Sequence, residues 1–200
     1  MGACVVRYHK YLDDRYVPLM LYLYLTTLIE MIGGVVFAWW MMTGEYWNTT
    51  ALYNFQTIEE FCLLSWLYFN FYRSVYLKNL VIAANVFFLP VACWFYWQNP
   101  FEWNSPTMAL ESLFLIAFVM LYFYELIVKE SHIRFTTVPM FWISAGVMLY
   151  FAGGFFVFVC SDYLVKSPKS WLWQINHLVN IPYHILMAVG LWITKKKSAA

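Results

Sequence analysis

Six apolar segments, each about the length of a membrane span, follow one another along this chain with short polar stretches between them. A helix needs about 20 apolar residues to cross the hydrocarbon core of a bilayer. The composition agrees, because only 12% of the 200 residues are charged, against about one quarter in soluble domains. We therefore predict an all-α fold, a polytopic transmembrane bundle of six helices.

The expected organisation is a cytoplasmic N-terminal segment, one transmembrane domain and a basic cytoplasmic tail, at residues 1–16, 17–194 and 195–200. Two of the helices contain an internal proline, Pro90 or Pro182, and we expect a bend at each. The six helices are predicted at residues 17–42, 51–72, 76–97, 107–128, 137–159 and 170–194.

The basic residues predict the orientation of the bundle. All but two of the twelve lysines and arginines precede the first span, follow the last, or lie in the two loops on that same side of the membrane. The exceptions are Lys166 and Lys169. Basic residues gather on the cytoplasmic side of membrane proteins, so both termini are expected in the cytoplasm.

The last span has one polar face. Trp173, His177, Asn180 and His184 recur at steps of four, three and four, which places them on one side of a helix. Polar groups in hydrocarbon require polar partners or a water-filled cavity. The other spans are expected to supply those partners.

Acidic residues in the other spans are the expected partners. Glu30 lies in the middle of the first span, and a carboxylate at that depth is costly and a functional candidate. Glu60 and Glu111 lie near the outer starts of the second and fourth spans. We predict one polar cavity, open to the outer face and reaching the midplane, with ligand-binding or relay residues Glu30, Glu60, Glu111, His177, Asn180 and His184.

Structural alternatives exist for several of these side chains. Glu59 and Glu111 could stabilise helix N-termini, where a carboxylate favours the positive end of the helix dipole. Glu125 could pair with Lys129, four residues further on. His184 could be a hydrogen-bonded core histidine.

Several segments, among them TLIEMIG, YNFQTIEEF, FWISAG and WLWQINHLVNIPYHILMAVGLW, resemble an uncharacterised family of small bacterial multi-pass membrane proteins. The resemblance covers most of the chain from Arg7 onward and implies a place in the inner, cytoplasmic membrane. It implies no established activity, only a loose association with membrane signalling kinases. Similar proteins have one more helix before the RYHKYLDD segment.

Three functions fit these observations. The favoured one is a non-enzymatic, ligand-sensing or signalling protein whose partners are the bilayer and a membrane signalling protein, because too little chain lies outside the spans for a catalytic domain. The second is a proton-coupled transporter or channel that uses Glu30 and the histidines. The third, an intramembrane metal hydrolase, is disfavoured because HxxxH and HExxH are absent. No cofactor, metal or nucleic acid is expected.

Overall fold

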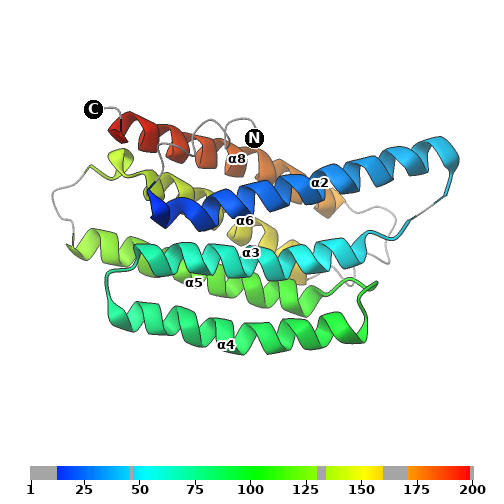
Figure 1. Ribbon diagram of the computed structural model, residues 1–200, viewed down its shortest axis with the longest axis horizontal. Helices are drawn as coiled ribbons and strands as arrows, with labels where there is room; N and C mark the ends of the chain where they lie inside the picture. The colour runs from blue at the N-terminus through cyan, green and yellow to red at the C-terminus, as the bar shows by residue number, and fades with distance from the viewer. Residues whose placement is uncertain (1–12, 46, 130–133, 160–170, 199–200) are drawn as a thin grey trace.

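The computed structural model describes residues 13–45, 47–129, 134–159 and 171–198, and it is an all-α bundle. The all-α prediction is confirmed for these residues, which contain six α-helices and no strand. The helices lie along one long axis (Figure 1). Their bounds are α2 Val17–Thr43, α3 Thr50–Phe71, α4 Val75–Gln98, α5 Ser105–Lys129, α6 Pro139–Val159 and α8 Trp171–Ser198.

Helices adjacent in sequence pack as antiparallel neighbours, because short loops join them. The most extensive contact is between α6 and α8, followed by that between α5 and α6. In contrast, α2 packs mainly against α3, and its second half projects beyond the other helices (Figure 1). Because α2 has few contacts with helices other than α3, the side of α2 that faces α6 and α8 can line a cavity.

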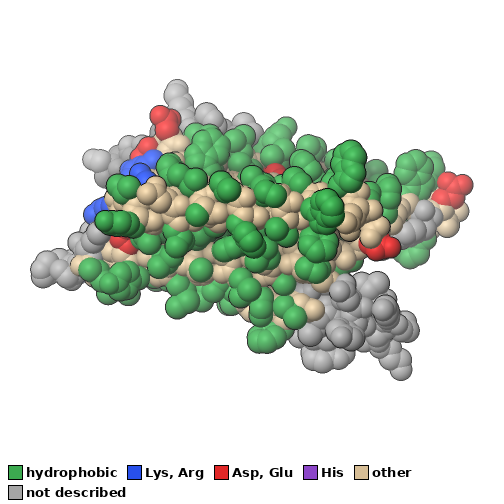
Figure 2. Space-filling model, turned by 90° about the horizontal axis from the view of Figure 1, so that it is seen from below, with side chains coloured by type: hydrophobic (Ala, Val, Ile, Leu, Met, Phe, Trp, Pro, Cys, Tyr) green, Lys and Arg blue, Asp and Glu red, His purple; other side chains and the backbone are tan. Residues whose placement is uncertain are grey.

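Four of the helices are long and apolar enough to cross a membrane, in the spans Asp14–Thr43, Val75–Gln98, Ser105–Val128 and Pro139–Val157. In the described part of α8 the apolar stretch is shorter, Leu178–Thr194, and α3 carries several buried polar residues among its apolar ones. Apolar side chains cover most of the face seen in Figure 2. Trp94 and Phe156, for example, are 65% and 71% exposed, as expected of a surface solvated by lipid.

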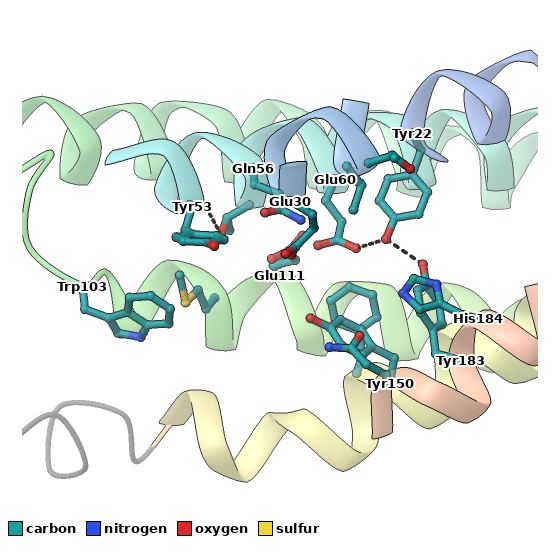
Figure 3. A pocket seen from close by; sticks show the side chains of 16 residues that line it. Tyr22, Glu30, Tyr53, Gln56, Glu60, Trp103, Glu111, Tyr150, Tyr183 and His184 are labelled. Carbon is teal, nitrogen blue, oxygen red and sulfur yellow. Dashed lines mark hydrogen bonds between the residues drawn. The ribbon is translucent and has the colours of Figure 1, made fainter. Parts of the chain in front are cut away.

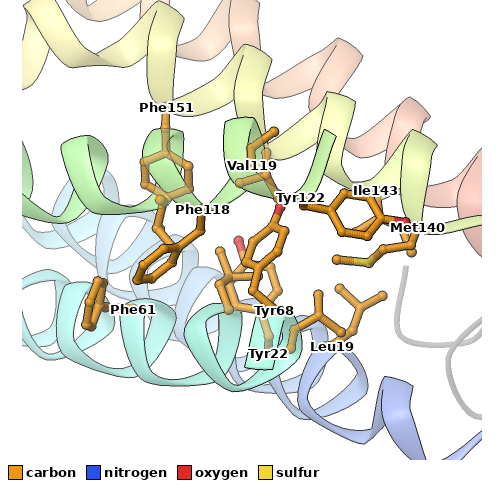
Figure 4. Packing of buried hydrophobic residues seen from close by; sticks show 14 of the residues in the cluster. Leu19, Tyr22, Phe61, Tyr68, Phe118, Val119, Tyr122, Met140, Ile143 and Phe151 are labelled. Atoms are coloured by element: carbon orange, nitrogen blue, oxygen red, sulfur yellow. The ribbon is translucent and has the colours of Figure 1, made fainter. Parts of the chain in front are cut away.

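Aromatic rings from α3, α5 and α6 are prominent in the core (Figure 4), and Phe88 of α4 packs against them. Phe61 is fully buried and its ring centroid lies 4.0 Å from that of Phe88 and 6.3 Å from that of Phe118. The buried hydroxyl of Tyr72 donates to the Phe118 carbonyl oxygen at 2.7 Å. This well-packed side of the bundle fixes α3 and α5 relative to each other.

The Glu125 side chain makes a contact that the sequence analysis did not predict, whereas the side chain of Lys129 lies outside the described residues. The Glu125 side chain is buried and accepts hydrogen bonds from the backbone N–H groups of Arg73 and Ser74, at 3.1 and 3.0 Å. Arg73 and Ser74 directly precede α4, where backbone N–H donors lack a partner within the helix. Glu125 therefore ties α5 to the loop between α3 and α4.

Candidate functional site

A cavity of about 640 Å³ lies between α2 and α3 on one side and α6 and α8 on the other, with α5 behind it (Figure 3). Trp103 lies at one end, and Tyr22, Tyr183 and His184 lie at the other. The volume is within the range of small-molecule sites. Its lining residues are Tyr22, Thr26, Thr27, Glu30, Tyr53, Gln56, Thr57, Glu60, Trp103, Met108, Glu111, Tyr150, Phe151, Asn180, Tyr183 and His184.

A chain of hydrogen bonds links three helices at the end of the cavity opposite Trp103. The Tyr183 hydroxyl of α8 donates to the Tyr22 hydroxyl of α2 at 2.7 Å. The Tyr22 hydroxyl in turn donates to Oε1 of Glu60 on α3 at 2.5 Å. All three side chains are buried. The donor-to-acceptor direction of the two hydrogen bonds runs from Tyr183 through Tyr22 to Glu60, because a carboxylate oxygen accepts hydrogen bonds.

Glu111 is the most deeply buried carboxylate on the cavity wall. Its side chain is 3% exposed, and its Oε1 atom has no hydrogen-bond partner. It does not cap α5, because Asn104 accepts the hydrogen bond from the Thr107 N–H at the start of that helix and Glu111 lies more than a turn further on. The alternative role of Glu111 as a helix cap is therefore wrong.

Glu59 has an environment of its own. It lies well inside α3 rather than in the first turn, so it does not stabilise the helix N-terminus. The residue is 8% exposed, and neither carboxylate oxygen has a hydrogen-bond partner. It is not among the residues that line the cavity. Glu59 is therefore a buried carboxyl group of α3 that lies outside the cavity lining.

Glu30 lines the middle of the cavity, but the residue is exposed. Gly33, one turn further along α2, allows Tyr53 to approach, because a Cβ atom at that position would lie 2.6 Å from the Tyr53 hydroxyl. The carboxylate of Glu30 is therefore reachable from outside the bundle, whereas that of Glu111 is enclosed.

The structure brings five of the six predicted site residues to this one cavity, namely Glu30, Glu60, Glu111, Asn180 and His184. The side chain of the sixth, His177, lies outside the described residues. His184 lies beside the Tyr183 ring, 5.1 Å between centroids, and the residue is exposed.

The sequence analysis missed the aromatic half of the site, above all Tyr22, Tyr53 and Tyr183. One signal was available, because Tyr22, Thr26 and Glu30 follow one another at steps of four on the same face of α2. Tyrosines near span ends are also common at membrane interfaces. The sequence therefore does not distinguish a tyrosine at the membrane interface from one that lines an interior cavity.

Among the residues described, no three His, Cys, Asp or Glu side chains are grouped as they would be to hold a metal ion. The site instead combines separated carboxylates with aromatic rings and amide groups. Such a surface suits the binding of a molecule by several weak contacts.

Comparison with known proteins finds no matching family model, no matching curated protein and no matching solved structure. The site itself is therefore the basis for an assignment of function.

Proposed function

We propose that this chain is a multi-pass protein of a bacterial inner membrane that binds a small ligand in its cavity and transmits the bound state to a membrane partner. The cavity lies among the helices of the bundle. The six helices occupy nearly all of the chain that the structure describes.

The proposed orientation has both termini in the cytoplasm. The Lys and Arg side chains visible in Figure 2 lie at one end of the bundle. Arg15, Arg73 and Arg134 lie at or between helix ends on that side, whereas Glu45 and Glu102 occupy loops at the other end. This asymmetry supports the positive-inside arrangement.

The enclosed carboxylate of Glu111 is the observation that carries the proposal of ligand binding. A buried oxygen without a donor costs about 1–3 kcal/mol, and more when the group is charged. A protein retains such a cost where it serves function. A ligand that donates a hydrogen bond to Oε1 would recover that energy, and the cavity offers it space.

The test is to purify the wild-type protein and the Glu111→Ala variant from the same host membranes and to analyse their bound small molecules by mass spectrometry. We expect the wild type to carry about one molecule of a bound compound per protein chain. The amount bound per chain should be at least about tenfold lower in the variant. Glu45→Ala, at an exposed position outside the cavity, is the matched control. Identical extracts from all three folded proteins would contradict ligand binding at this site.

A proton-coupled transporter is the second candidate, and the Tyr183–Tyr22–Glu60 chain favours it. Hydroxyl and carboxyl groups in series are suited to passing protons inside a membrane. If the protein conducts protons, liposomes with a pH gradient and an enclosed pH dye should show flux that Glu60→Gln abolishes. Flux equal to that of empty liposomes would leave sensing as the function.

A further inference from the structure

We propose that the ligand of this cavity is an organic cation, a protonated primary or secondary amine on an apolar or aromatic body. This proposal rests on the proposed function, since it names the chemistry of the ligand for the same site. It is carried by the charge of the lining, the unsatisfied oxygen of Glu111 and the aromatic walls.

The charge of the lining is negative. Three carboxylates, those of Glu30, Glu60 and Glu111, border the cavity, and no Lys or Arg is among the lining residues. His184 is the basic side chain of the lining, and it lies at the far end from Trp103. An anionic ligand would be repelled in this low-dielectric setting, whereas a cation would be attracted to the carboxylates.

The hydrogen-bonding capacity of the site calls for donors. Glu60 receives one donor, the Tyr22 hydroxyl, while Oε1 of Glu111 receives none. An ammonium group has up to three N–H donors and no acceptor. It would satisfy Glu111 and supply a second donor to Glu60. A quaternary ammonium would leave the Glu111 oxygen unpaired, which is why the amine is assigned N–H groups.

The size and walls of the cavity point to an organic ion. A volume of about 640 Å³ greatly exceeds the roughly 30 Å³ share of one water molecule, so a bare ion would not span it. The aromatic residues Tyr22, Tyr53, Trp103, Tyr150 and Tyr183 line it, and the faces of such rings attract cations. They also offer apolar surface to the body of the ligand.

The test uses purified protein in phosphatidylcholine nanodiscs and pairs of probes that share one hydrocarbon body and differ in carrying an ammonium or a neutral hydroxyl group. Each pair is an amine and its alcohol, namely phenethylamine with 2-phenylethanol and hexylamine with 1-hexanol, and 3-phenylpropionate is the anionic probe. Binding is measured by equilibrium dialysis at pH 7. We expect both amines to bind at least tenfold more tightly than their alcohols, and the anion not to bind.

Glu111→Gln should reduce the preference for amines at least tenfold, and Glu30→Gln, at the exposed side of the cavity, should reduce it less. Glu45→Gln should leave it unchanged. Unfolding midpoints of each variant confirm that the bundle is intact. If the amines show no preference over the alcohols in the wild type, the assignment of a cation is wrong.

The outcomes separate this assignment from the proposed function. Alcohols that bind as well as the amines, with a ligand still recovered from host membranes, would overturn the cation but leave the binding site. The ammonium could belong to a free amine or to a lipid headgroup, and nanodiscs that contain phosphatidylethanolamine distinguish them. Loss of amine binding in these discs assigns the cation to the lipid, and unchanged binding assigns it to a free amine.

Discussion

Replacing Gly190 with alanine is expected to destabilise the bundle by about 1–3 kcal/mol, the usual cost of overfilling a packed interior. Glycine to alanine within a helix normally stabilises by up to about 1 kcal/mol. At Gly190 the substitution should instead lower the free energy of unfolding, because the new Cβ would lie 2.6 Å from Cγ1 of Ile143 and 2.9 Å from the Pro139 carbonyl oxygen. A backbone atom cannot move aside as a flexible side chain does, so α8 must shift from α6.

Gly34→Ala is the matched control, because a Cβ atom at that helical position has no neighbour within 4 Å. Its unfolding midpoint in detergent should equal or exceed that of the wild type. The Gly190→Ala variant should also lose ligand affinity, since α8 supplies Asn180 and Tyr183 to the cavity. Equal midpoints for the two variants would show that the contact of α6 with α8 is looser than the structure has it.

The fold could be predicted largely from the length of the apolar segments. A bilayer requires about 20 apolar residues per helix, and the loops contain most of the charges, so helix number and approximate bounds follow from the sequence. The partners of each helix do not follow. The close contact of α6 with α8 depends on Gly146 and Gly153 meeting Tyr183, Leu186 and Val179, and small residues alone do not identify the opposing side chain.

The candidate site could be predicted in part, from charge and helical spacing. A carboxylate inside a span is so costly that Glu30, Glu60 and Glu111 are candidates wherever the helices pack. The depth of these residues relative to one another does not follow from the sequence, because antiparallel helices can slide against each other and the sequence does not give their offset. Tyr22 and Tyr183 were missed because a tyrosine suits both the membrane interface and the interior.

Tyr22→Phe is expected to have the largest effect at the site, a destabilisation of roughly 2–4 kcal/mol. A hydrogen bond to a charged group contributes about 1.5–3 kcal/mol, and removing one partner of a buried charge costs more than the bond itself. The substitution deprives Glu60 of its donor and Tyr183 of its acceptor at once. The ring remains, so packing in the buried position of Tyr22 is preserved.

Tyr183→Phe is the control that tests the direction of this hydrogen-bond chain. It removes the first donor but leaves the Tyr22 hydroxyl bonded to Glu60, so the expected cost is about 1 kcal/mol. Chemical unfolding in detergent micelles measures both values. Once Glu60 is replaced by leucine, Tyr22→Phe should cost under about 1 kcal/mol, because the buried acceptor is gone. Equal costs for the two tyrosines would mean that Glu60 does not depend on Tyr22, and the coupling of α2, α3 and α8 through this chain would be wrong.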